Sequence, residues 1–185
     1  MLVYEETGAD RSMLLNYNNK LYSSGNNVGP STKENFDAFA NYGKHMVNTY
    51  TAYDWFEVWN EPDGSWAWED ENVVDYTYLA EITKNEIVKE NADAKTLIGV
   101  DLSNGSFVRG TFDNGLWPNM DMAVHHPYMD PNKVDTNYNN KLSGMTSAIV
   151  DAGGWKEQII TEVGWSTYTG GGATEEQAAI ELAKQ

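Results

Sequence analysis

Short apolar runs alternate along this chain with longer segments in which apolar residues recur at helical spacing. The apolar runs have the length of β-strands and occupy residues 11–16, 55–60, 95–103, 120–128 and 157–165. The longer segments predict helices over residues 33–49, 73–90, 139–153 and from 174 onward. A chain that alternates strand and helix pairs its strands in parallel through right-handed crossovers, so the pattern predicts an α/β fold.

The predicted helices have specific expected ends and buried faces. Ser31 or Thr32 can cap the helix over 33–49, and Gly153 is a natural stop for the third helix. The first helix is expected to bury Phe36, Phe39, Ala40, Met46 and Val47. The second helix is expected to bury Val74, Tyr78, Ile82 and Ile87.

Polar side chains recur where the predicted strands end. They are Asn16, Asn60, Glu61, Asp101, His125, His126 and Glu162. Parallel strands joined by helices fit two architectures, an open doubly wound sheet and an eightfold β/α barrel. No glycine-rich phosphate loop follows any strand, which disfavours the nucleotide-binding sheet. Active residues of a barrel gather at the carboxyl ends of its strands, so the pattern favours a (β/α)8 TIM barrel.

The chain is short for a complete barrel. That fold usually has eight strands and about 250 residues, whereas this chain has 185 residues. We find five clear strands in it. We therefore expect residues 1–185 to form a single, partial barrel domain that contains about strands three to seven.

The composition limits the partners that the chain can bind. The net charge of −16 argues against nucleic acid and anionic membranes, because phosphate groups require clustered lysine and arginine. The absence of cysteine excludes disulfides, thiolate catalysis and sulfur-ligated zinc. No apolar stretch is long enough to span a membrane, and the N-terminus lacks the features of a signal peptide. These features do not determine the cellular compartment of the protein.

Two glutamates follow comparable strands. Glu61 directly follows the run WFEVWN, and Glu162 directly follows the run EQIIT. A carboxylate at the end of a buried strand costs folding free energy unless it is paired. We therefore expect both glutamates to take part in catalysis. The alternative is that they form structural ion pairs. On parallel strands both side chains would open at the same rim. Two facing carboxylates can divide the cleavage of a glycosidic bond between an acid and a nucleophile, and a separation of roughly 5–5.5 Å gives retention of configuration.

The sequences around these glutamates resemble those of a known group of enzymes. EVWNEPD is similar to the fourth-strand motif of clan A glycoside hydrolases, and IITEVGWST is similar to their seventh-strand motif. The segment 14–50 also resembles cellulase-like members near glycoside hydrolase families 39 and 5. The resemblance implies a retaining O-glycosyl hydrolase that cleaves an oligo- or polysaccharide and needs no cofactor. It implies Glu61 as the general acid/base, Glu162 as the nucleophile and Asn60 as a donor to the sugar 2-hydroxyl.

Two adjacent histidines end the fourth predicted strand. VHHPYMD resembles the sixth-strand motif of the clan, which implies that Tyr128 donates to the nucleophile and that His126 lines the sugar subsite. A metal site is the rival interpretation, with His125 and His126 joined by Asp121 or Asp130. Adjacent residues on a strand face opposite ways, so the two histidines cannot easily chelate one ion. His125 is expected to be a buried structural residue.

Aromatic side chains near the two glutamates are candidates for stacking on sugar rings. The candidates are Trp66, Trp68 and Trp165. Packing over the barrel rim is the alternative, and we favour it for Trp59. Asn16, at the end of the first predicted strand, is a further candidate for contact with the substrate.

Two other functions remain open at this point. One is a non-catalytic carbohydrate-binding barrel, which the presence of both glutamates disfavours. The other is a metal-dependent hydrolase on the same barrel, which treatment with a chelator would distinguish. The resemblance implies a carbohydrate as the partner, and an extracellular or periplasmic location for the full-length parent.

Overall fold

The computed structural model describes most of the chain. The described residues are 8, 10–16, 19–22, 29–69, 72–99, 105–128, 140, 143–144, 146–147, 149–151, 156–167 and 172–183. Three features named above lie outside them: Asp101 at the end of a strand, Asp130 of the metal hypothesis and the helix stop at Gly153.

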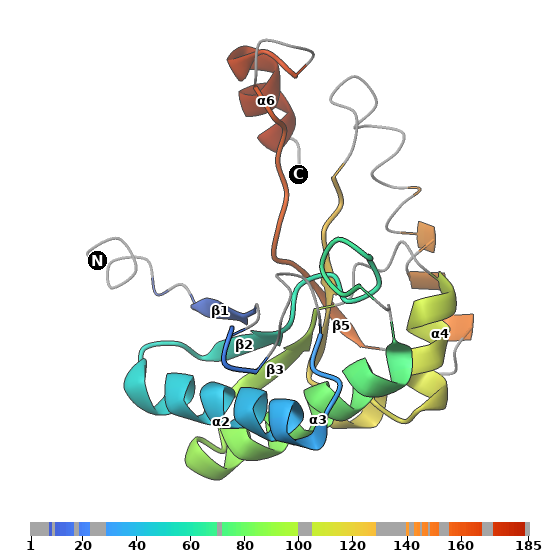
Figure 1. The fold of residues 1–185 in the computed structure, drawn as a ribbon. Helices are drawn as coiled ribbons and strands as arrows, with labels where there is room; N and C mark the ends of the chain where they lie inside the picture. Colours follow the sequence, from blue (N-terminus) through green and yellow to red (C-terminus); the bar gives the residue numbers. More distant parts are fainter. Residues whose placement is uncertain are drawn as a thin grey trace.

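Five strands form one parallel sheet in the order of the chain. They are β1 (Ser12–Leu15), β2 (Trp55–Val58), β3 (Lys95–Ile98), β4 (Met122–His125) and β5 (Glu157–Ile160). All neighbouring pairs are parallel, and the sheet order is β1-β2-β3-β4-β5 (Figure 1). Each strand lies beside its predecessor and runs the same way, which is the connectivity of a barrel wall; a doubly wound sheet reverses its order. The predicted partial barrel is confirmed.

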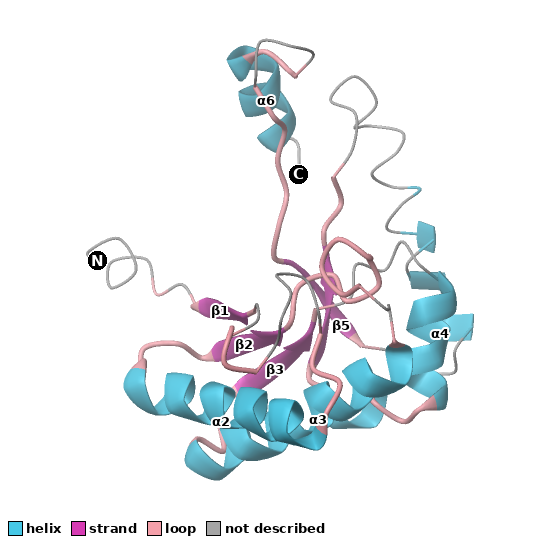
Figure 2. Ribbon diagram, viewed as in Figure 1, coloured by secondary structure: helices cyan, strands magenta, loops and turns pink. Residues whose placement is uncertain are grey.

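Helices cover one side of this sheet. The helical elements are α2 (Lys33–Thr49), α3 (Val73–Glu90), α4 (Gly105–Asp113), η1 (Trp117–Asn119) and α6 (Glu175–Leu182). Figure 2 shows α2, α3 and α4 along the same side of the strands, whereas α6 lies apart at the end of an extended segment. The described residues between 140 and 151 are helical, as the sequence predicts. In the described part of the chain, no helix combines the length and the apolar character that crossing a bilayer requires.

Helix α2 has the bounds that its sequence predicts. The Oγ1 of Thr32 accepts a hydrogen bond from the backbone N–H of Asn35 at 3.3 Å, so Thr32 is the cap. The residues buried as predicted are Phe36, Phe39, Ala40 and Val47. Met46 is only partly buried. This apolar face packs α2 against the sheet and against α3.

Helix α3 also has the predicted bounds; Ile87 is buried and Ile82 is partly buried, as expected, but the other two residues predicted to be buried are exposed. Val74 and Tyr78 are 56% and 41% exposed, so their predicted burial is wrong. The buried residues of this helix are Tyr76, Thr77, Leu79, Ala80, Thr83 and Ile87. Two threonines and an alanine make this face only moderately apolar, so its hydrophobic pattern in the sequence is weak.

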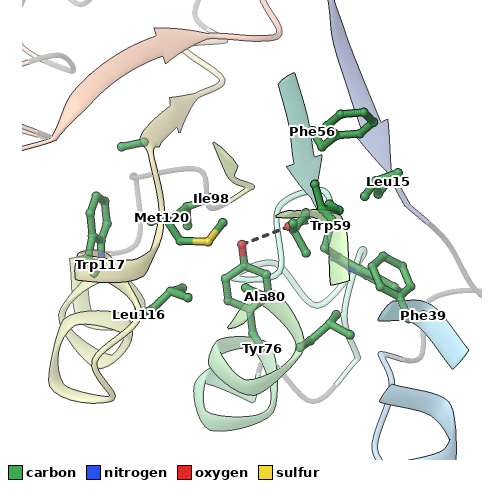
Figure 3. Packing of buried hydrophobic residues seen from close by; sticks show 14 of the residues in the cluster. Leu15, Phe39, Phe56, Trp59, Tyr76, Ala80, Ile98, Leu116, Trp117 and Met120 are labelled. Atoms are coloured by element: carbon green, nitrogen blue, oxygen red, sulfur yellow. Dashed lines mark hydrogen bonds between the residues drawn. The ribbon is translucent and has the colours of Figure 1, made fainter. Parts of the chain in front are cut away.

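The hydrophobic core lies between the strands and the helices. It joins Leu15 of β1 and Phe56 of β2 to Phe39 of α2, and it continues past Tyr76 to Trp117 in η1 (Figure 3). One continuous core therefore supports the first four strands at their carboxyl ends, where the polar residues predicted from the sequence are found.

Tyr76 connects the buried face of α3 to two strands (Figure 3). Its hydroxyl donates to the carbonyl oxygen of Val58 at 3.1 Å, the dashed line in Figure 3. The same hydroxyl accepts a hydrogen bond from the N–H of Gly99 at 2.9 Å. These backbone groups lie where β2 and β3 end. The hydroxyl of Tyr76 therefore supplies a hydrogen-bond partner to backbone groups at the end of the sheet. Burial raises the pKa of the Tyr76 hydroxyl, which keeps the proton that it donates.

We expect Tyr76→Phe to lower the free energy of unfolding by about 1–3 kcal/mol, because it leaves two buried backbone groups without a partner. Chemical denaturation of the full chain measures this loss. Tyr78→Phe is the matched control, since Tyr78 lies on the same helix and is exposed. An equal effect of the two substitutions would contradict the role given to the buried hydroxyl.

Candidate active site

Strand β2 ends in a tight turn that places Glu61 at the carboxyl rim of the sheet. Trp59 and Glu61 have φ angles of 64° and 44°, a conformation that costs a residue with a side chain roughly 1–3 kcal/mol. The N–H of Trp59 donates to the carbonyl oxygen of Leu15 at 2.9 Å. The N–H of Glu61 donates to the carbonyl oxygen of Gly99 at 2.8 Å. The turn is thus tied to both neighbouring strands, which fixes the direction in which Glu61 points.

The close approach of this turn to β3 requires a glycine. A Cβ at Gly99 would lie 1.8 Å from the carbonyl oxygen of Trp59. The indole of Trp59 is 1% exposed, and its Nε1 donates to the carbonyl oxygen of Ala67 at 3.1 Å. This packing and this hydrogen bond offset the backbone strain. Trp59 therefore has a structural role at the rim, as the sequence analysis favoured.

Both carboxylate oxygens of Glu61 accept hydrogen bonds. Its Oε1 lies 2.8 Å from Nδ1 of His126, and its Oε2 accepts from Nε1 of Trp66 at 2.9 Å. The side chain of Glu61 is 13% exposed. One oxygen is therefore held from below by a buried ring, while the other faces an indole that is itself exposed to solvent.

Glu162 lies just beyond β5 and is more open than Glu61. Its side chain is 34% exposed, and its Oε2 accepts a hydrogen bond from the hydroxyl of Tyr128 at 3.0 Å. This is the contact that the sequence analysis expects from Tyr128. Burial and the hydrogen bond to Glu162 raise the pKa of Tyr128 to about 12, so the hydroxyl keeps the proton that it donates.

The two glutamates meet at one rim. A carboxylate oxygen of Glu61 and one of Glu162 lie within 4.8 Å of each other. Their elements are separated in the sheet by β3 and β4, so the curvature of the sheet brings the two ends together. This upper limit on one pair of oxygens is compatible with the roughly 5–5.5 Å between the carboxyl groups of retaining glycosidases.

His126 lies beneath this pair. Its side chain is 0% exposed, so the expectation that it lines a sugar subsite is wrong. Its Nε2 lies 3.0 Å from Oγ1 of Thr161 and 3.5 Å from Oε1 of Glu57, and its Nδ1 contacts Glu61. Burial alone lowers the pKa of His126, but the nearby carboxylates of Glu57 and Glu61 outweigh it and raise the pKa to about 10. The surrounding carboxylates therefore favour the protonated form of this buried ring.

His125 faces the opposite side of β4. It is 1% exposed, and its Nε2 lies 2.5 Å from Oε1 of Gln158 on the neighbouring strand. The two histidines thus contact different groups, as the alternation of side chains on a strand requires. His125 is a buried structural residue, which agrees with the expectation from the sequence.

The tryptophans divide between the core and the rim. Trp68 is 2% exposed and its ring packs against Trp59 with centroids 5.2 Å apart, so its expected role in sugar binding is wrong. Its indole fills the space above Gly29, where a Cβ would lie 1.9 Å from the ring. Trp66 is 64% exposed, and Trp165 is partly buried beyond β5.

Several polar atoms beside the pair lack partners. The backbone N–H of Asn60 donates to Oδ1 of Asn16 at 3.3 Å, so the two residues lie side by side. The buried atoms Nδ2 of Asn16, Oδ1 of Asn60 and Nε1 of Trp165 have no hydrogen-bond partner among the described residues. Such atoms are uncommon in folded proteins, and a buried polar atom without a partner calls for an explanation.

Solved structures supply a comparison for this architecture. No protein-family model and no curated protein sequence matches the chain. A glucosidase from Croceicoccus marinus matches 85% of this chain with a TM-score of 0.68 and 14% identity, over 36% of its own chain. A monomeric beta-xylosidase from Caulobacter crescentus CB15 matches 76% with a TM-score of 0.55 and 17% identity, over 32% of its own chain. The GH39 enzyme from Xanthomonas axonopodis pv. citri matches 78% with a TM-score of 0.55 and 18% identity, over 32% of its own chain.

The chain forms part of a (β/α)8 barrel. It spans about a third of the length of these three structures, and the likeness at such identities is one of fold. These three structures are glycoside hydrolases, the group whose motifs the sequence resembles.

A metal ion is the alternative occupant of the partial barrel's rim. Three residues each offer one ligand atom here, and these atoms lie within 4.8 Å of one another: Glu61, His126 and Glu162. A ring nitrogen must be deprotonated to bind a metal, and the raised pKa of His126 opposes this. Asp121, the described acidic candidate from the sequence, lies before β4 and accepts hydrogen bonds from Thr96 instead. The residues present therefore fit a hydrogen-bonded carboxylate pair better than a metal site.

Three residues of this site of the partial barrel were not found by sequence reasoning: Glu57, Thr161 and Gly99. Glu57 lies within an apolar strand, where a charged residue is itself a signal, since burial of an unpaired carboxylate is costly. Thr161 precedes Glu162 and carried no separate signal. Gly99 follows β3 directly, and a glycine at a strand end indicates close approach of another backbone segment.

Proposed function

We propose that this partial barrel carries the catalytic pair of a retaining O-glycosyl hydrolase, with Glu61 as the acid/base and Glu162 as the nucleophile. The observation that supports this most directly is the approach of their carboxylate oxygens to within 4.8 Å at the carboxyl rim. The resemblance of both motifs to clan A glycoside hydrolases and the fold of the matched structures agree with it.

The reaction would proceed in two displacements. In the first, a carboxylate oxygen of Glu162 attacks the anomeric carbon, the bond to the leaving oxygen breaks, and Glu61 gives that oxygen its proton. In the second, Glu61 takes a proton from water, and the water oxygen displaces Glu162 from the sugar. The hydroxyl of Tyr128 holds Oε2 of Glu162 and so directs its other oxygen to the sugar.

Glu61 must present a protonated oxygen to the leaving group in the first step. Its Oε1 is held by His126, so Oε2 is the oxygen that can turn to the substrate. The Nε1–H of Trp66 now occupies Oε2. Entry of substrate would therefore displace this contact, and the exposed face of Trp66 would then stack on a sugar ring.

Polar groups at the rim would bind the hydroxyls of the sugar. The unpartnered atoms of Asn16, Asn60 and Trp165 offer donors and acceptors beside the carboxylate pair. The pairing of Asn60 with Asn16 orients the amide that would contact the 2-hydroxyl. A site built to satisfy such atoms with ligand hydroxyls discriminates strongly against ligands that lack them.

Covalent labelling by 2-deoxy-2-fluoroglycosides tests the proposal. Because the matched structures include a xylosidase and a glucosidase, the panel contains xylosyl and glucosyl reagents, with mannosyl and galactosyl reagents added. We expect one reagent to add its glycosyl mass to the full chain, and peptide mapping to place the adduct on Glu162. The labelling should persist in EDTA, because the proposed chemistry uses no metal.

Two results would contradict the proposal. One is the absence of an adduct with every reagent, while a glycosidase of known mechanism is labelled in parallel. The other is an adduct at a different residue, or equal labelling of the wild type and Glu162→Gln.

A further inference from the structure

Glu57 is a buried acidic residue to which the proposed mechanism gives no task. It lies within β2, on the strand that leads to Glu61, and its side chain is 3% exposed. Burial of an isolated carboxylate costs several kcal/mol, so a compensating partner is expected. His126 is such a partner, because Oε1 of Glu57 lies 3.5 Å from its Nε2.

The strand register explains why these two residues meet. Glu57 lies opposite Leu97 of β3, which in turn lies opposite Met122 of β4. Residues an even number of positions apart share a face of an extended strand, so His126 continues the face of Met122. Glu57 and His126 are therefore on the same face of the sheet.

The ring of His126 links Glu57 to the carboxylate of Glu61. Its Nδ1 lies 2.8 Å from Oε1 of Glu61, while its Nε2 faces both Oγ1 of Thr161 and Oε1 of Glu57. A neutral imidazole has one N–H and one lone pair, so it could donate on one side only. The doubly protonated ring can donate its Nδ1–H to Glu61 and its Nε2–H to Oγ1 of Thr161 at 3.0 Å, and the carboxylate of Glu57 lies beside this second N–H at 3.5 Å.

We propose that Glu57 is a positioning residue for Glu61, which acts by keeping the ring of His126 doubly protonated and its Nδ1–H directed at Oε1 of Glu61. Anchored at Oε1, Glu61 would present Oε2 to the leaving oxygen. The role in positioning the acid/base rests on the proposed function, whereas the charge state of His126 does not.

The charged groups around His126 come from several elements. Glu57 and Glu61 approach from β2 and its turn, and Glu162 approaches from beyond β5 with an oxygen 3.9 Å from Nδ1. Burial lowers the pKa of His126, but the three carboxylates together raise it to about 10. Because the pKa is raised above the value of about 6.5 for a free imidazole, the resulting stability is fully present below about pH 6.5 and is lost as the pH rises through about 10.

Nitrogen NMR of the histidine rings tests this inference directly. The chain has three histidines, so substitution of each assigns the signals. In the wild type, we expect both ring nitrogens of His126 to stay protonated through pH 8. In Glu57→Gln, we expect the midpoint of the pH titration of the His126 ring to fall by at least about one pH unit, because a neutral amide no longer favours the cation. Glu157→Gln is the matched control, since Glu157 is an exposed residue at the start of β5.

Two further measurements separate positioning from a merely structural role. Glu57→Asp keeps the charge, so its His126 should titrate close to the wild type; this variant also serves if Glu57→Gln does not fold. On a substrate identified by labelling, Glu57→Gln should lower kcat by about tenfold or more with little change in KM. A neutral His126 at pH 7 in the wild type, or an unchanged midpoint in Glu57→Gln, overturns the inference. Failure of the covalent labelling alone would overturn the proposed function and leave the NMR result standing.

Discussion

Glu162→Ala is expected to lower kcat on an aryl β-glycoside by roughly 10⁴-fold or more, because it removes the group that forms the covalent intermediate. Initial rates on a glycoside of the sugar found by labelling measure this loss. Glu157→Ala is the matched control, since it makes the same substitution at the exposed, opposite end of β5. Thermal unfolding of both variants should match the wild type closely, since Glu162 is partly exposed and is not a member of the hydrophobic core.

Rescue of activity by azide distinguishes the nucleophile, assigned to Glu162, from the acid/base, assigned to Glu61. In Glu162→Ala, azide can occupy the space of the missing carboxylate and attack the anomeric carbon directly, so a β-glycoside should give the α-glycosyl azide. In Glu61→Ala, the glycosyl-enzyme still forms on a substrate with a good leaving group, and azide should then give the β-glycosyl azide. Product NMR reads the configuration. The same configuration from both variants, or an unchanged kcat in Glu162→Ala, would contradict the assignment.

Gly99→Ala is expected to lower the free energy of unfolding by about 3 kcal/mol, the upper range for insertion of one carbon into a packed site. The added Cβ would lie 1.8 Å from the carbonyl oxygen of Trp59, and backbone cannot move aside as a flexible side chain can. The turn that aims Glu61 should shift as well, so activity should fall in the fraction that stays folded. Chemical denaturation measures the first effect, and active-site titration with a labelling reagent measures the second.

Gly105→Ala is the control for this substitution. A Cβ at Gly105 would meet nothing within 4 Å, and the residue begins α4. Alanine is the better helix former, so this variant should be as stable as the wild type or slightly more stable. Equal losses in the two variants would contradict the steric explanation.

Local patterns were sufficient to predict most of the backbone. The helix over 33–49 has strong periodicity and clear ends, and the structure has it where the sequence places it; the strand that contains Phe56 begins at Trp55 as predicted but ends at Val58 rather than at residue 60. The buried face of α3 could not be predicted, because Thr77 and Thr83 are buried there while Val74 is exposed. Which face of a helix is covered depends on its neighbours, and a single sequence does not specify them.

The candidate site was predictable to the extent that topology determines it. Residues that follow parallel strands share a rim, and this rule alone brings Glu61 toward Glu162. The depth of each side chain below the rim required coordinates. His126 is buried under the pair, whereas the sequence analysis placed it in contact with sugar; Trp68 is in the core although it lies in the same loop as the exposed Trp66.

The left-handed backbone at Trp59 and Glu61 has a consequence for any effort to engineer this chain. Glycine adopts such angles without penalty, so a procedure that selects sequences for thermal robustness alone would favour glycine at both positions. One of these replacements would erase a carboxylate that we consider essential. Libraries built for heat tolerance should therefore hold this turn constant and seek their gains on the solvent-facing sides of the helices.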